Sequence, residues 1–131
     1  MNYPEYFPDN CPPKEATVPS GEFYRFINSS HTSPQENDFL PWLREYPDRK
    51  YFVTKCQACG TSIFPSLDAV NNMLAQVPAL RKKKIARGVL NSDLGKIQNT
   101  PSQNEKSHHT WWIPEASEPW KLFQMINLDK I

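Results

Sequence analysis

The amino-acid sequence predicts an α+β fold: a single domain with a mostly antiparallel sheet of about five to six strands and two helices. Several short runs of β-branched and aromatic residues are separated by turn residues, which is typical of strands. One longer segment carries apolar residues at helical spacing. The connections are short, which favours antiparallel neighbours with helices on one face of the sheet.

We expect strands at the runs rich in β-branched and aromatic residues, of which the segment 62–64 is the shortest. These runs are residues 22–27, 50–54, 62–64, 85–90, 96–100, 109–113 and 122–127. The clearest helix is expected after Ser66, a favourable N-cap, and before Pro78. Its apolar face would hold Leu67, Val70, Met73, Leu74 and Val77. A second helix is expected near residues 39–43, with Pro41 inside it.

Residues 1–20 are expected to form a proline-rich arm, and residues 21–131 to form the domain. The arm holds Pro4, Pro8, Pro12, Pro13 and Pro19 of the 13 prolines, and proline disfavours helix. Its aromatic rings are expected to pack on the domain or on a second copy of the chain.

Composition excludes several function classes. The chain is 38% hydrophobic and 22% charged, as globular proteins are, and its formal net charge is +1. No apolar run is long enough to span a membrane, and the first residues do not resemble a signal peptide. We therefore expect a cytoplasmic protein. Its three cysteines are an odd count and predict reduced thiols rather than a disulfide framework.

The segment Cys56-Gln57-Ala58-Cys59-Gly60 has the spacing of half a zinc site. Tetrahedral zinc needs two more ligands, and the candidates are scattered: Cys11, His31, His108 and His109. We expect no metal and no cofactor, with Cys56 and Cys59 as the alternative metal ligands.

The segment His108-His109-Thr110-Trp111-Trp112 is the most unusual in the chain. Strand alternation places His108, Thr110 and Trp112 on one face and His109 and Trp111 on the other. A histidine there could act as a general base or acid, or could line a pocket for a flat ligand. Aromatic residues on strands more often pack in a core or an interface.

Arg25 interrupts a hydrophobic strand, where it shares one face with Phe23 and Ile27. We expect its guanidinium to reach the surface along its aliphatic stem, with anion binding in a pocket as the alternative. The run Arg81-Lys82-Lys83-Lys84 is expected to be a solvated surface, since nucleic-acid binding usually needs a broader basic stripe.

Nucleophilic side chains are available at Cys59, Ser62 and Ser66, and His108 or His109 could serve as their base. No nucleophile elbow, phosphate-binding glycine loop or metalloprotease motif marks any of them.

The order of FYRF (23–26), CxxCGTSIF (56–64) and TP…HHTWW (100–112) resembles small uncharacterised bacterial proteins of mobile elements and integron gene cassettes. The resemblance covers about residues 22–126 and implies a compact α+β homodimer without an assigned activity. It implies a genetic context and no reaction.

A second resemblance is to ADP-ribosyltransferase-like folds. Those folds use an early strand with Tyr-Arg or His-Arg, then a Ser/Thr-rich strand leading into a helix. Tyr24-Arg25 and the segment 61–66 would occupy these places. The resemblance also implies a late catalytic glutamate, for which only Glu105 and Glu115 are available.

Two functions follow as hypotheses. The first is a non-enzymatic, self-associating binding protein whose aromatic pocket or interface has walls built from Tyr24, Arg25, His108, His109, Trp111 and Trp112. The second is a small transferase or hydrolase using His108 or His109 with Arg25. A zinc-stabilised or nucleic-acid-binding module is a third alternative. The sequence leaves open whether the protein is an enzyme.

Overall fold

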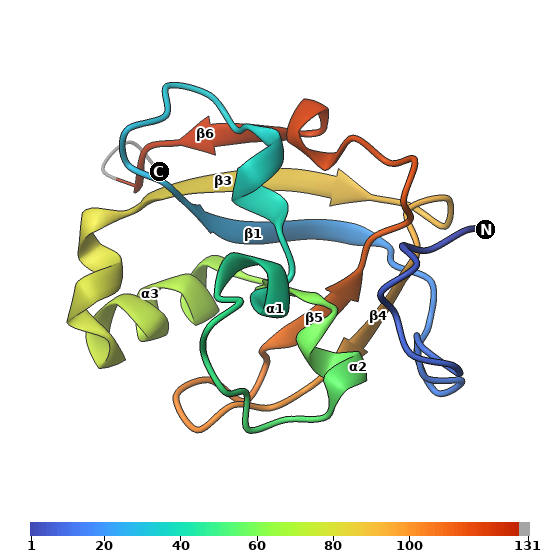
Figure 1. Cartoon of the computed structure of the whole chain (residues 1–131). Helices are drawn as coiled ribbons and strands as arrows, with labels where there is room; N and C mark the ends of the chain where they lie inside the picture. The colour runs from blue at the N-terminus through green and yellow to red at the C-terminus, as the bar shows by residue number, and fades with distance from the viewer. Residues whose placement is uncertain (129–131) are drawn as a thin grey trace.

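The computed structural model describes residues 1–128 and shows two three-stranded antiparallel sheets (Figure 1). The first sheet has the order β1-β3-β6, with strands Gly21–Ile27, Lys84–Leu90 and Phe123–Ile126. The second has the order β2-β5-β4, with strands Thr61–Ile63, His109–Trp112 and Lys96–Asn99. The α+β class is confirmed, although two small sheets replace the one sheet expected.

The two sheets meet where the edge of β1 touches the end of β2. Tyr24 and Phe64 exchange both backbone hydrogen bonds there, at 2.8 and 2.9 Å. This isolated bridge is too short to merge the sheets, but it fixes the position of β1 relative to β2. Side chains that flank the bridge are therefore held in register between the sheets.

Helix α3, Leu67–Gln76, covers one face of the first sheet (Figure 1). The Ser66 side chain accepts a hydrogen bond from the Ala69 amide at 3.1 Å, so the expected N-cap is confirmed. The remaining helices are short: α1 (Trp42–Glu45), α2 (Lys55–Ala58), and the 3-10 turns η1 (Glu36–Phe39), η2 (Pro78–Lys82) and η3 (Pro119–Lys121). Among residues 1–128, no helix has the length and apolarity to cross a membrane.

Two sequence-based expectations for local structure are wrong. Residues 50–54 form a loop rather than a strand, and Thr54 instead caps α2 by accepting from the Gln57 amide. The run is β-prone, but Phe52 is 93% exposed, so no second layer covers it. The helix expected near 39–43 is divided into η1 and α1, because Pro41 cannot continue a helix and serves as the N-cap of α1.

The tryptophans of β5 lie in the core. Trp111 is 0% exposed and packs between the two sheets with Phe23 and Phe123, while Trp112 is 1% exposed and packs with Ala16. Each indole nitrogen is satisfied, since Trp111 Nε1 donates to the Leu94 carbonyl and Trp112 Nε1 to that of Cys56. The strand alternation predicted for β5 agrees with this packing.

This packing corrects the first functional hypothesis. Tyr24 is 5% exposed and also belongs to the core, so Tyr24, Trp111 and Trp112 do not form the walls of an open pocket or interface. Their rings supply the apolar area that a small two-sheet fold must bury to be stable. The interface proposal loses three of the six residues on which it depended.

The N-terminal arm is tied to the domain by a disulfide between Cys11 and Cys56. It also pairs with β4, since Thr17 and Ile97 exchange backbone hydrogen bonds at 2.8 and 2.7 Å. The expectation of reduced thiols is thus wrong. The odd cysteine count concealed the pair because the third thiol, Cys59, is buried and free.

Gly60 lies against Thr110 with no room for a side chain. A Cβ at this position would collide with Thr110 Cγ2. We expect Gly60→Ala to cost about 1–3 kcal/mol of unfolding free energy, as overpacking usually does. The double variant Gly60→Ala with Thr110→Ser should regain part of this stability, because serine lacks the colliding methyl. Chemical denaturation of the two variants checks this, and equal loss in both would contradict it.

Candidate functional site

Arg25, Ser62 and His108 come together where β1 meets β2, and we call these three residues the junction site. Arg25 lies on β1, Ser62 on β2, and His108 directly before β5. β2 and β5 pair with Ser62 opposite Thr110, so His108, two residues earlier, falls on the face that carries Ser62. All three side chains are partly exposed.

Arg25 holds three elements together. Its Nε donates to the Asp38 carbonyl at 2.6 Å, and its Nη1 donates to the Ser62 carbonyl at 2.8 Å. Its Nη2 lies 3.8 Å from Glu45 Oε2. The side chain is only 11% exposed, so the expected surface position is wrong. Burial lowers the pKa of Arg25, while the Glu45 and Asp38 charges oppose this shift, and a guanidinium stays protonated in proteins.

His108 is fixed in one tautomer by its neighbours. Its Nδ1 lies 2.8 Å from the Thr100 carbonyl, which can only accept, so Nδ1 carries the proton. Burial lowers the pKa of His108 below its ordinary value of 6.5, with a smaller opposing effect from the bond to Thr100. The ring is therefore neutral at pH 7, and Nε2 is a free base.

Ser62 lies at the free nitrogen of this base. The Ser62 Oγ and His108 Nε2 atoms are 2.8 Å apart, so the hydroxyl donates to the imidazole. At this distance a neutral imidazole can act as a general base and take the proton of the hydroxyl. The Thr100 carbonyl orients the base, and Arg25 fixes the backbone of the hydroxyl residue. The junction site therefore has the groups needed to accept a proton through the Ser62 hydroxyl.

The low pKa of His108 has a consequence for stability. Protonating His108 disfavours the folded state, because the unfolded chain takes up this proton more readily. We expect the unfolding free energy to fall as pH drops below 6.5, and to fall less steeply in His108→Gln. Denaturation at pH 7, 6 and 5 tests this, and parallel curves for both proteins would contradict it.

Glu105 anchors the loop that leads to His108. One carboxylate oxygen accepts from the Ser107 hydroxyl and amide, at 2.5 and 2.9 Å, and the other accepts from Asn72 Nδ2 at 2.8 Å. These hydrogen bonds lower the pKa of Glu105. A charged carboxylate is thereby held three residues before His108 in the chain and tied to α3.

A small polar cavity of about 80 Å³ opens beside Arg25. Asp38 lies in its wall at 7% exposure, and its carboxylate accepts from the Asn28 and Gln35 amides and contacts His31 Nδ1 at 2.8 Å. Glu45 lines the cavity as well. The guanidinium of Arg25 is thus reached from solvent through a polar opening.

The other residues singled out from the sequence lie elsewhere. His109 faces away from the junction site, with Nδ1 at 2.7 Å from the Ser107 carbonyl and its ring against Phe23. Cys56 is bonded to Cys11 and cannot offer a thiolate, so the alternative zinc pair of Cys56 and Cys59 is excluded in this state. No cluster of three or more metal-ligating side chains occurs within residues 1–128.

Sequence reasoning missed three contributors to the site: Asp38, Glu45 and Thr100. Glu45 lies in no recognisable motif, and each of the three acts through a long-range contact or a backbone carbonyl. One signal for Asp38 exists in the sequence, since an acidic residue in a first helical turn is often a cap. Asp38 does form part of the capping box with Gln35 at the start of η1.

Comparison of this chain with family models, curated proteins and solved structures finds no match. The resemblance to mobile-element and integron cassette proteins stays a prediction. Function is therefore argued from the geometry of the site alone.

Proposed function

We propose that this protein is a small transferase of the ADP-ribosyltransferase-like kind, with NAD as the donor substrate. The observation that carries the proposal is the place of Ser62, whose carbonyl accepts from Arg25 and whose hydroxyl donates to His108, each at 2.8 Å. The resemblance implies an arginine on an early strand beside a Ser/Thr strand that leads into a helix. β1, β2 and α3 have this arrangement.

The roles of the three residues follow from their protonation states. In the proposed reaction, the bond between the ribose C1′ and the nicotinamide nitrogen breaks, and nicotinamide leaves with the bonding electrons. The acceptor, water or a nucleophilic side chain, forms the new bond to C1′. Its proton passes through the Ser62 hydroxyl to Nε2 of His108. Arg25 keeps Ser62 in place, because its Nη1 donates to the Ser62 carbonyl.

One part of the resemblance has no direct counterpart. The late glutamate would be Glu105 or Glu115. The Glu105 carbonyl accepts from the His108 amide at 3.3 Å, but the Glu105 carboxylate bonds Ser107 and Asn72 rather than a side chain of the junction site. Glu105 is the nearer in sequence, and its anchored loop positions His108. In this proposal, His108 takes the place of a carboxylate as the proton acceptor.

Release of nicotinamide from NAD tests the proposal. We expect the wild-type protein to release nicotinamide, and His108→Gln to lower kcat by about 10²–10⁴, the range of general-base catalysis. His109→Gln is the matched control, because the adjacent imidazole faces Phe23, and it should stay near the wild-type rate. A wild-type protein with no NAD turnover would contradict the proposal, as would equal losses in the two histidine variants.

A second candidate is a serine hydrolase, favoured by the same 2.8 Å contact between Ser62 and His108. In that reaction Ser62 Oγ would attack a carbonyl carbon, and its proton would pass to His108. An organophosphonate probe separates the two functions. Covalent labelling of wild-type protein that is lost in Ser62→Ala would support the hydrolase, whereas the transferase proposal expects no labelling.

Self-association and location complete the proposal. The expectation of a homo-oligomer now lacks its aromatic interface, and light scattering tests it directly. The sequence predicts cytoplasmic residence, but the Cys11–Cys56 disulfide favours an oxidising compartment, where such bonds persist. Alkylation of protein taken directly from cells decides between them, since only reduced Cys11 and Cys56 would be labelled.

A further inference from the structure

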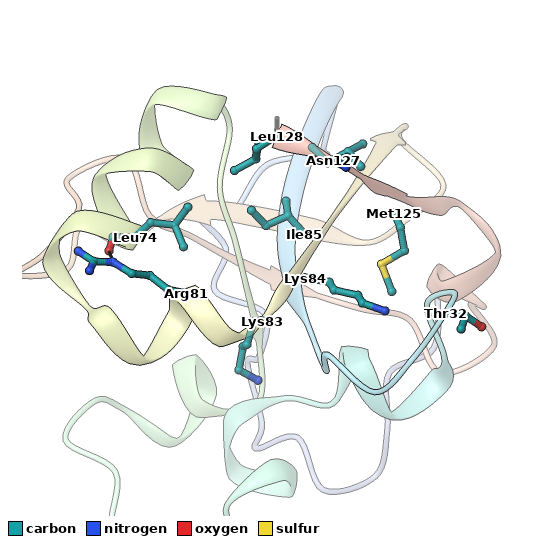
Figure 2. Close-up of a pocket in the computed structure, with 10 residues that line it drawn as sticks. Thr32, Leu74, Arg81, Lys83, Lys84, Ile85, Met125, Asn127 and Leu128 are labelled. Carbon is teal, nitrogen blue, oxygen red and sulfur yellow. Dashed lines mark hydrogen bonds between the residues drawn. The ribbon is translucent and has the colours of Figure 1, made fainter. Parts of the chain in front are cut away.

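A larger pocket lies between η2 and the end of β6, apart from the junction site (Figure 2). Its volume of about 540 Å³ falls within the range of small-molecule sites. It is lined by Thr32, Leu74, Arg81, Lys83, Lys84, Ile85, Met125, Ile126, Asn127 and Leu128. Elements from four parts of the chain meet here, so the folded structure is needed to form the pocket.

The floor of this pocket is aliphatic. Ile85 lies at its centre, with Leu74, Met125 and Leu128 around it (Figure 2). The residues that line it include no aromatic ring, so a flat base or ring would find nothing on which to stack. A flexible aliphatic chain would bury its surface on these side chains and gain hydrophobic stabilisation.

The rim is cationic, and the described residues that line the pocket include no acidic side chain. Arg81 and Lys84 extend on opposite sides of Ile85 (Figure 2). Arg81 donates from Nε to the Leu74 carbonyl at 2.9 Å, a bond that uses one of its three nitrogens, and Lys84 Nζ donates to the His31 carbonyl at 2.7 Å. Within residues 1–128, neither residue forms an ion pair. Both charges are thus held in place by neutral carbonyls and remain uncompensated.

We propose that this pocket binds a single-chain anionic amphiphile, with its aliphatic tail on the Ile85 floor and its carboxylate or phosphate head at the rim that carries Arg81 and Lys84. The positive charge at the rim favours an anionic head group. Among the described residues, the lining has aliphatic side chains and no aromatic rings, which favours a flexible aliphatic tail over a flat ring. The site is separate from the junction site and does not depend on the proposed transferase activity.

Calorimetric titration with decanoate and decyl phosphate tests the proposal on the full chain. Both should bind, and octanoate should bind about tenfold more weakly than decanoate, because each buried methylene contributes about 0.8 kcal/mol. Acetate and decanol, which carry only the head or only the tail, should bind at least about tenfold more weakly than decanoate. Equal binding of decanol and decanoate would overturn the role of the cations.

Variants within one basic run locate the site. Arg81→Gln and Lys84→Gln should each weaken decanoate binding by about tenfold, the loss of one charge-assisted hydrogen bond. Lys82→Gln is the matched control, because Lys82 lies in the same run but does not line the pocket. A similar loss in Lys82→Gln would show that only general surface charge attracts the ligand, and would overturn the proposal. Failure of wild-type protein to bind either decyl compound would do the same.

Discussion

Trp111→Ala is expected to destabilise the folded state by about 3–5 kcal/mol, the range for removing a large buried aromatic side chain. Trp111 is 0% exposed and packs between the two sheets, so its removal leaves a cavity that both sheets line. It also leaves the Leu94 carbonyl without the indole donor at 2.6 Å. The total unfolding free energy of a domain of this size is about 5–15 kcal/mol. The midpoint of thermal unfolding should therefore fall by roughly 10–20 °C.

Trp42→Ala is the control for this experiment. Trp42 is only half-buried and contacts Tyr46 and Tyr51 at the edge of the molecule, so its loss should cost much less. Thermal unfolding followed by circular dichroism compares the two variants. Equal midpoints would contradict the core position of Trp111 and restore the hypothesis that the β5 tryptophans serve an interface.

Removing the Cys11–Cys56 disulfide should be the second large effect. The bond closes a loop across 45 positions of sequence and joins the arm to α2. Loss of such a cross-link typically costs about 2–4 kcal/mol, largely because the unfolded chain gains freedom. We expect Cys11→Ser with Cys56→Ser, or wild-type protein in reductant, to unfold at a lower temperature and to release the arm to proteases.

Cys59→Ala provides the matched control, because the Cys59 thiol is buried and free. Burial raises the pKa of this thiol, which keeps it protonated and unreactive at neutral pH. Cys59→Ala should lose stability in reductant by as much as the wild-type protein does. A Cys59→Ala variant that is insensitive to reductant would indicate a disulfide involving Cys59, and would contradict the pairing in the structure.

Local sequence signals were sufficient to predict most of the fold. The amphipathic spacing and N-cap of α3 lie within one segment, and the β-branched and aromatic runs that became β1, β3 and β5 are likewise local. The loop at 50–54 could not be predicted in this way. Its residues favour a strand, but strands need partners, and pairing depends on distant parts of the chain.

The junction site was only partly predictable for a related reason. Arg25 and His108 were singled out as unusual residues in strands, and Ser62 was one of several possible nucleophiles. Their meeting depends on the bridge between Tyr24 and Phe64 and on the pairing of β2 with β5. No spacing in the sequence encodes these long-range contacts. The same limit applies to the tryptophans, because a strand pattern does not tell whether a second sheet covers both faces.

The proposed transferase activity depends most on the state of the His108 ring and on its contact with substrate. Nitrogen-detected NMR of the histidine side chains measures the tautomer, the pKa and the response to a ligand together. We predict that His108 is protonated on Nδ1 at pH 7, titrates below 6.5, and shifts when NAD is added, while the His109 resonances stay unchanged. A His108 ring that carries its proton on Nε2, or that does not respond to saturating NAD, would contradict the proposed transferase.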